Sequence, residues 1–263
     1  MPKILLLVQY DGTFFYGYQR QINARSVQED LEKALSTCLR QEIAIEAAGR
    51  TDTGVHAKGM TVSFTLPYPI ENFHKLLRSV NALSGEGLAV ISGKNMPDDF
   101  HAQFSCTGRE YEYWFLNTQF PRPLYQKRAY WIRKPLNFTR IRKELELLVG
   151  EYDFSSLTKT ASLQFKKTPM RKIFATGLYA VSEVEGLYKI RIYGKSFLHN
   201  MIRIIVGTIF DLASGKLQAD SILQIIQEKD RRVAGKTLPP DGLYFLKAYY
   251  ANHPEVDELY SIL

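Results

Sequence analysis

The segment from Gly49 to Ala57 places a carboxylate and a guanidinium close together between glycines. Arg50 and Asp52 are two residues apart and follow an apolar stretch that predicts a strand. Where the backbone stays extended, side chains two residues apart lie on one face, so Arg50 would hold Asp52 ionised and oriented. A fixed, ionised carboxylate can act as a nucleophile or as a base. Taken alone, the pattern also fits a surface turn that carries a structural ion pair.

Five more segments form, together with this one, a pattern that extends through most of the chain. They are Tyr10–Gln19, Phe100–Ser105, Arg109–Tyr113, Leu198–Gly207 and Pro239–Leu246. In order and spacing, the six segments resemble the motifs of the bacterial tRNA pseudouridine synthase A (TruA) family. Two positions depart from the usual family pattern, since Tyr18 replaces a tryptophan and Leu238 replaces a common alanine. Neither position is expected to take part in the chemistry.

The resemblance implies a role for three residues of these motifs. Asp52 would be the catalytic aspartate, Arg50 would orient it, and Tyr111 would lie against the target uracil. The alternative for Tyr111 is a core position in a half-buried strand, because aromatic residues alternate along this segment. Arg203 is a further candidate for the cleft, as a partner of a phosphate or a carboxylate, and a structural ion pair is its alternative.

The implied reaction is the isomerisation of uridine within folded RNA. The bond from ribose C1′ to uracil N1 breaks, the uracil turns, C5 bonds to C1′, and the C5 proton leaves. Asp52 could add to C1′, add to C6 of the uracil or abstract a sugar proton, and all three routes stay open. An aromatic face such as that of Tyr111 can replace the stacking that an extruded base loses, and its hydroxyl is a candidate base for the C5 proton. The reaction requires no redox step or energy source, and we expect no cofactor and no metal.

The sequence around these motifs predicts alternating strands and helices. A capping box at Ser26–Glu29 begins the first expected helix, and Asn137 is the expected N-cap of a later one, with Gly150 as its end. Strands are expected at residues 4–8, 43–48, 60–66, 110–116, 179–184, 189–193 and 243–249, and further helices at residues 73–83, 199–213 and 222–226.

This order predicts an α+β fold, and the resemblance implies the pseudouridine synthase type. We expect two similar α/β halves that share a mostly antiparallel central sheet flanked by helices, with the active-site cleft between them. Residues 1–103 would form the half that carries the catalytic aspartate. Residues 104–250 would form a basic, RNA-binding half, and residues 251–263 a peripheral tail.

Charge is distributed unevenly along the chain, whose formal net charge is +7. Residues 1–103 contain 10 Lys/Arg and 11 Asp/Glu, whereas residues 104–263 contain 24 and 16. Basic clusters can bind a phosphate backbone, although each can also be a solvated face. Arg231 and Arg232 are candidates for binding RNA phosphates, and Leu243 in the last motif is a candidate substrate contact. The clusters are Arg122, Lys127, Arg128, Arg133, Lys134; Lys166, Lys167, Arg171, Lys172; and Lys229, Arg231, Arg232, Lys236.

Two other classes of protein share parts of this pattern. Asp52-Thr53-Gly54 is also the triplet of aspartic proteases, but these enzymes need two such carboxylates and this chain has one triplet. A non-catalytic RNA-binding or RNA-folding module would explain the basic half and the aromatic strands. Such a module gains nothing from a carboxylate beside the path of the phosphates, so Asp52 and Arg50 separate the two interpretations.

The remaining features concern partners and location. The apolar run at residues 4–8 is too short to span a membrane, and Cys38 and Cys106 form no disulfide or zinc pattern, which favours a reducing cytoplasm. The five histidines have no metal-ligand spacing. The resemblance implies a homodimer that binds tRNA at the anticodon stem-loop and modifies positions 38, 39 and 40.

Overall fold

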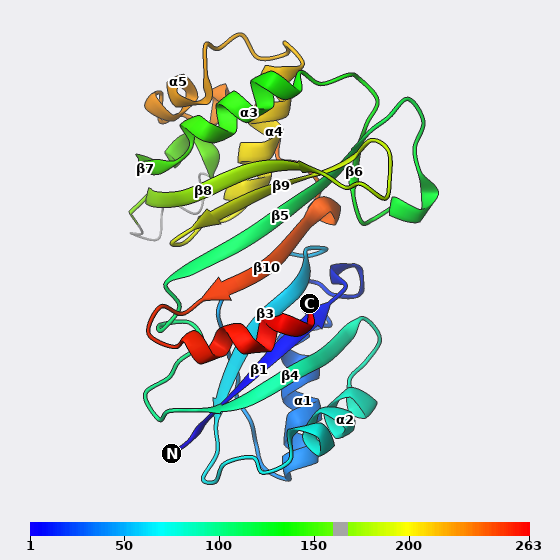
Figure 1. Cartoon of the computed structure of the whole chain (residues 1–263), viewed down its shortest axis with the longest axis vertical. Helices are drawn as coiled ribbons and strands as arrows, with labels where there is room; N and C mark the ends of the chain where they lie inside the picture. Colours follow the sequence, from blue (N-terminus) through cyan, green and yellow to red (C-terminus); the bar gives the residue numbers. More distant parts are fainter. Residues whose placement is uncertain (160–167) are drawn as a thin grey trace. The chain divides into compact units, whose positions relative to one another are not determined.

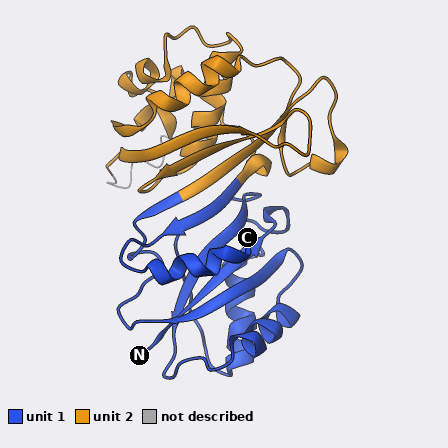
Figure 2. Cartoon of the chain, in the orientation of Figure 1, with its two compact units in different colours: residues 1–109, 244–263 blue, residues 110–243 orange. Residues whose placement is uncertain are grey.

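The computed structural model describes residues 1–159 and 168–263 of the chain. These residues form two compact units, which Figure 2 shows in different colours. Unit 1 consists of Met1–Arg109 and Tyr244–Leu263, and unit 2 consists of Glu110–Leu243. The chain passes from one unit to the other twice, and both passages lie within a strand.

Unit 1 is built on a sheet whose strand β1 carries a buried apolar run. The strand β1 buries the run from Ile4 to Val8 completely and pairs antiparallel with both of its neighbours. The last strand of the chain adds to this sheet in parallel, with Tyr244 opposite His56. In sheet order the strands are β4 (Leu88–Met96), β1 (Lys3–Tyr10), β3 (His56–Thr65) and β10 (Leu243–Tyr249), and the short β2 (Glu46–Ala47) pairs with β3.

Two capped α-helices accompany the sheet of unit 1. At the start of the first helix, Oγ of Ser26 accepts a hydrogen bond from the amide of Glu29 at 3.3 Å. At the start of the second, Oδ1 of Asn72 accepts one from the amide of Lys75 at 2.9 Å. These contacts satisfy amides that the helices themselves leave unpaired. The helices are α1 (Val27–Leu39) and α2 (Phe73–Leu83), with the short 3-10 helices η1 (Gly12–Phe14) and η7 (Pro254–Ile262).

Unit 2 repeats the combination of an antiparallel sheet with helices (Figure 1). The N-cap Asn137 accepts from the amide of Arg140 at 2.9 Å, and α4 buries nearly every residue along its length. The strands are β5 (Gly108–Asn117), β9 (Leu187–Gly194), β8 (Met170–Ala180) and β7 (Gly150–Asp153), with β6 (Tyr130–Ile132) parallel to β5. The helices are α3 (Phe138–Leu147), α4 (Met201–Ala213) and α5 (Ile222–Gln227), with the 3-10 helices η2 (Pro123–Tyr125), η3 (Ser155–Leu157), η5 (Arg231–Val233) and η6 (Pro240–Gly242).

The structure confirms the predicted α+β class and most of the predicted elements. It differs at residues 43–48, where only Glu46–Ala47 is strand. The amides of Ile43 and Ile45 instead donate to side chains of α1, at 2.9 and 3.1 Å, so they are not available to a neighbouring strand. It also differs at β8, which begins at Met170 and ends before the predicted residues 181–184, and at β4, for which the sequence pattern predicts no element.

The division into units also differs from the predicted one. The first unit extends to Arg109 rather than 103 and includes the C-terminal residues from Tyr244 onward. These residues return to unit 1 because β10 pairs with β3. The predicted peripheral tail is packed as well, since Val256 and Leu259 of η7 are buried. The hydroxyl of Tyr260 accepts a hydrogen bond from the amide of Ala248 at 3.0 Å and donates to the carbonyl of Gly59 at 3.1 Å.

Tyr260→Phe should therefore destabilise the protein. It leaves one backbone amide and one backbone carbonyl of the sheet without this partner, and an unsatisfied buried group costs about 1–3 kcal/mol. Urea unfolding measures the change in the free energy of unfolding. Tyr68→Phe is the matched control, because Tyr68 is exposed and its hydroxyl has no hydrogen bond among the described residues. Equal stabilities of the two variants would show that the tail is not held by Tyr260.

Candidate active site

Asp52 lies in the loop between β2 and β3, at the first position of a tight turn. The amide of Val55 donates to the carbonyl of Asp52 at 3.1 Å, and Gly54 has a positive φ of 79°. Glycine suits this third turn position because a Cβ would be strained there. The Asp52 side chain is half-buried, between a buried residue on one side and an exposed one on the other. The backbone of the turn therefore sets the direction in which the carboxylate leaves the chain.

The segment that begins the chain's first motif packs directly on this turn. A Cβ on Gly12 would lie 2.2 Å from the carbonyl oxygen of Val55 and 2.6 Å from the carbonyl carbon of Gly54, so only glycine fits. The amide of Gly12 donates to Nδ1 of His56 at 3.1 Å. Two segments more than 40 residues apart are thus joined backbone to backbone at the end of the Asp52 turn.

A second set of contacts holds the start of the turn. The amide of Tyr18 donates to the carbonyl of Thr51 at 3.0 Å, and the Thr51 hydroxyl lies 2.8 Å from that of Tyr10. Gly17 adopts a φ of 105° so that its backbone can pass close to the same carbonyl. Because Thr51 directly precedes Asp52, these contacts fix the backbone before the carboxylate, whereas Gly12 contacts the backbone after it.

His56 connects the first motif to the sheet. Its Nδ1 lies 3.2 Å from Oδ1 of Asp11, and that same oxygen accepts from the amide of Thr13 at 3.0 Å. The buried His56 ring stacks on Tyr244 of β10, with ring centroids 4.6 Å apart and planes at 18°. Asp11 thus caps η1 beside His56, which is the first residue of β3.

Arg50 lies in the loop that follows the short strand β2. Because β2 ends at Ala47, the backbone from residue 48 onward is irregular, and Arg50 is exposed. Its charge acts on Tyr18, where burial raises the hydroxyl pKa well above its usual range, Tyr10 and Glu32 raise it further, and Arg50 opposes them.

The other predicted site residues belong to unit 2. Tyr111 of β5 is buried, with its ring edge-on to that of Phe197 at a centroid distance of 5.2 Å. Arg203 lies in the first turn of α4, where its Nε donates to the carbonyl of Leu238 at 2.7 Å. Leu243 is buried at the start of β10. The structure thus brings Asp52 and Arg50 together in one unit, and Tyr111, Arg203 and Leu243 in the other.

The two arginines of η5 differ from each other. Arg231 is half-buried and donates to the carbonyl of Ala234 and the hydroxyl of Thr237, at 3.3 and 3.2 Å. Arg232 is exposed but pairs with Asp230, whose carboxylate lies 2.7 Å from its guanidinium. That pairing raises the pKa of Arg232 and lowers the pKa of Asp230. Lys166 and Lys167 of the second basic cluster lie outside the described residues.

Sequence reasoning missed several residues that position the site. One is Asn200, which adopts a left-handed conformation with φ 58° and accepts a hydrogen bond from Nη1 of Arg203 at 2.7 Å. Thr51, Tyr10 and His56 are others. All four lie within the motifs, but their contacts join residues that are distant in sequence or depend on a local turn. The sequence signal was therefore the motif itself and not any spacing within it.

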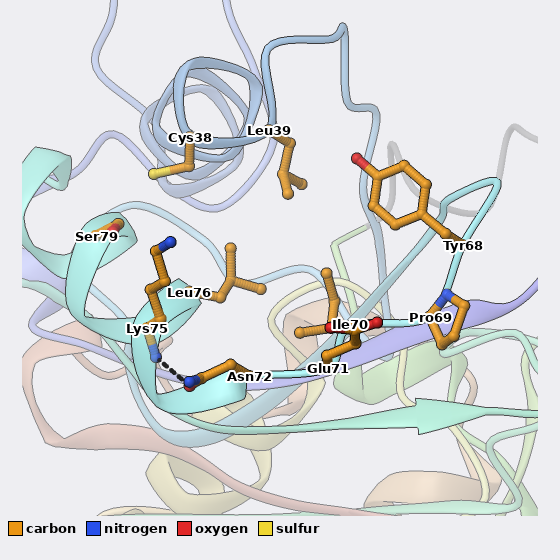
Figure 3. Close-up of a pocket in the computed structure, with 10 residues that line it drawn as sticks. All are labelled: Cys38, Leu39, Tyr68, Pro69, Ile70, Glu71, Asn72, Lys75, Leu76 and Ser79. Carbon is orange, nitrogen blue, oxygen red and sulfur yellow. Dashed lines mark hydrogen bonds between the residues drawn. The ribbon is translucent and has the colours of Figure 1, made fainter.

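A pocket on unit 1 contains none of the predicted site residues. It has a volume of about 440 Å³ and lies between the end of α1 and the start of α2 (Figure 3). Its walls are mainly apolar, and Glu71 and Lys75 are among the polar residues that line it. None of the described helices is long and apolar enough to cross a membrane.

Known proteins that match this chain over its whole length are tRNA pseudouridine synthases. A family model described as tRNA pseudouridine synthase matches residues 145–251. A tRNA pseudouridine synthase A from Leptospira biflexa is 48% identical over 264 residues, which cover 100% of this chain and 99% of the relative. Another from Acetivibrio thermocellus is 34% identical over 250 residues, covering 95% and 100%. A chain from a Cbf5-Nop10-Gar1 complex is similar with a TM-score of only 0.42 and 12% sequence identity. The match covers 90% of this chain and 50% of that chain.

Gly12→Ala should loosen the Asp52 turn. The added methyl group would collide with the backbone of Val55, and overpacking of this kind costs about 1–3 kcal/mol. We expect a lower free energy of unfolding and faster amide hydrogen exchange at Val55 and His56. Gly215→Ala is the control, because a Cβ there meets nothing within 4 Å and its cost is limited to its positive φ. Unchanged amide hydrogen exchange at Val55 in Gly12→Ala would show that Gly12 does not fix the turn of Asp52.

Proposed function

Because this chain belongs to the tRNA pseudouridine synthase A family and isomerises uridine to pseudouridine in tRNA, we propose that it acts at positions 38, 39 and 40 of the anticodon stem-loop. We propose Asp52 as the residue that starts the reaction. The observation that supports this role is that both ends of its turn are fixed. Gly12 packs on the end of the turn, and the hydrogen bonds of Thr51 fix its start. Positioning of this kind lowers the barrier because the reacting group needs no reorganisation.

The reaction breaks the C1′–N1 bond and forms a C1′–C5 bond, while C5 loses a proton and N1 gains one, so atoms and charge balance without a second substrate. Asp52, as a carboxylate, can begin it by adding to C1′, adding to C6 or removing a sugar proton. Arg50 is exposed, and it is the proposed residue that orients Asp52 when RNA is bound. The bound phosphates would then bring the exposed guanidinium to a fixed place.

Tyr111 is the proposed partner of the uracil. Its ring is already fixed by Phe197, so a base that leaves its stack meets a preformed aromatic surface. Its hydroxyl is the proposed base for the C5 proton. Leu243, which is buried and belongs to the last motif, is the proposed apolar contact to the extruded nucleotide.

Unit 2 is the proposed RNA-binding unit. Counted over the sequence, unit 1 contains 12 Lys/Arg and 14 Asp/Glu, and unit 2 contains 22 and 13. A polyanion is therefore attracted to unit 2. Arg203, Arg231 and Arg232 are the proposed phosphate or carboxylate partners, and Arg232 would exchange Asp230 for a phosphate. From the family resemblance we also propose a homodimer in the cytoplasm.

Pseudouridine mapping in the tRNA of a strain that lacks this gene tests the substrate. We expect pseudouridine to be lost at positions 38, 39 and 40 and restored by the wild-type gene, because these positions share the stem-loop that the site must admit. Uridine should appear there instead, while pseudouridine elsewhere in the same tRNAs provides the internal control. Loss at another position would overturn the assignment of the stem-loop, and no loss would favour the non-catalytic RNA-binding alternative.

A further inference from the structure

A segment of unit 2 between β5 and α3 has an unusual composition. Residues 118–136 contain five basic residues and no acidic residue. All five are exposed. The segment extends from the end of β5 through η2 and β6 toward α3 (Figure 1). The basic residues are Arg122, Lys127, Arg128, Arg133 and Lys134.

The base of this segment, which we call the 118–136 segment, is firmly attached to unit 2. Ala129 is buried in a small apolar cluster with Leu116 and Leu187, and Tyr125 packs against the same cluster. The side chain of Asn117 donates to the carbonyls of residues 132 and 134, at 3.0 and 2.8 Å. The segment therefore packs against a small apolar core of unit 2.

Two apolar side chains of the segment point away from that core. Phe120 is 71% exposed and Leu124 is 88% exposed, although Tyr125 beside them is packed inward. The backbone around Phe120 is held in place, because its carbonyl accepts from the Thr118 hydroxyl at 2.7 Å. The prolines at positions 121 and 123 restrict the chain further. An exposed aromatic ring on a fixed backbone loses little freedom when it binds a partner.

We propose that the 118–136 segment is an RNA-docking surface for the tRNA outside the target nucleotide. Phe120 stacks on an unpaired base, and the flanking basic side chains bind phosphates. The combination of an exposed aromatic ring with positive charge is how proteins bind single-stranded nucleic acid without sequence preference. The proposal rests on the tRNA substrate of the proposed function, and it adds a contact distinct from the motifs that carry the chemistry.

A second copy of the chain is the competing occupant. A symmetric contact through this segment would bring five positive charges against five others, which is unfavourable. A polyanion instead releases counterions as these charges bind it. The composition of the segment therefore favours RNA over a second copy, and the oligomeric state enters the test below as a separate outcome.

Titration of the full-length protein into labelled, unmodified tRNA transcript tests the proposal. Phe120→Ala should weaken binding by about 5- to 100-fold at all salt concentrations, since loss of one stacking contact costs that much. Phe120→Tyr should restore it. The double variant Arg133→Ala/Lys134→Ala should reduce the slope of log affinity against log salt by roughly 1.4 to 1.8, because each phosphate contact contributes about 0.7 to 0.9.

Matched controls come from unit 1. Tyr68→Ala removes an aromatic ring that is 49% exposed, and Lys75→Ala/Arg78→Ala removes two exposed charges of α2, and both should bind as wild type. Wild-type affinity and slope in the segment variants would overturn the docking proposal, as would a changed sedimentation coefficient in Phe120→Ala. Wild-type protein that forms no pseudouridine in the same tRNA would instead overturn the proposed function.

Discussion

The close approach of two backbones, at Gly12 and at Val55, is the constraint on which the site depends. A displacement of about 1 Å of a reacting group can lower the rate by about a hundred-fold, so the position of a catalytic carboxylate must be fixed. Here the turn that carries Asp52 is held at its end by Gly12 and His56 and at its start by Thr51. The motifs are thus not independent signals, because residues of the Tyr10–Gln19 motif fix the backbone of the motif that contains Asp52.

The two units carry opposite net charges, which agree with the roles proposed for them. Unit 1, which is net negative, contains Asp52, and unit 2, which is strongly positive, is the unit proposed to bind RNA. The chain passes between the units within β5 and within β10. Tyr111 and Leu243 lie close to these two passages, so the residues proposed to contact the uracil belong to the strands that connect the units.

Elements with local signals could be predicted from the sequence, and elements defined by distant contacts could not. The caps at Ser26 and Asn137 and the apolar runs of β1 and β10 are local, and each predicted element is present. By contrast, β4 is polar at residues 92–95 and pairs with β1. The amides of Ile43 and Ile45 donate to side chains of α1 and not to a neighbouring strand. The same distinction applies to the site. The motif located Asp52. The packing of Gly12 on the turn of Asp52 is a steric contact that the spacing of residues in the sequence does not predict.

The turnover of Asp52→Asn measures the central claim most directly. Asparagine is well suited to the first position of a turn, and the carbonyl that accepts from Val55 is unchanged, so the loop should keep its shape. Release of tritium from tRNA labelled at uridine C5 should fall by about a thousand-fold or more under single-turnover conditions, because the group that begins the reaction is gone. Binding of tRNA should stay near wild type. Retention of about a tenth of wild-type turnover by a folded, tRNA-binding Asp52→Asn would contradict the account and direct attention to Asp11.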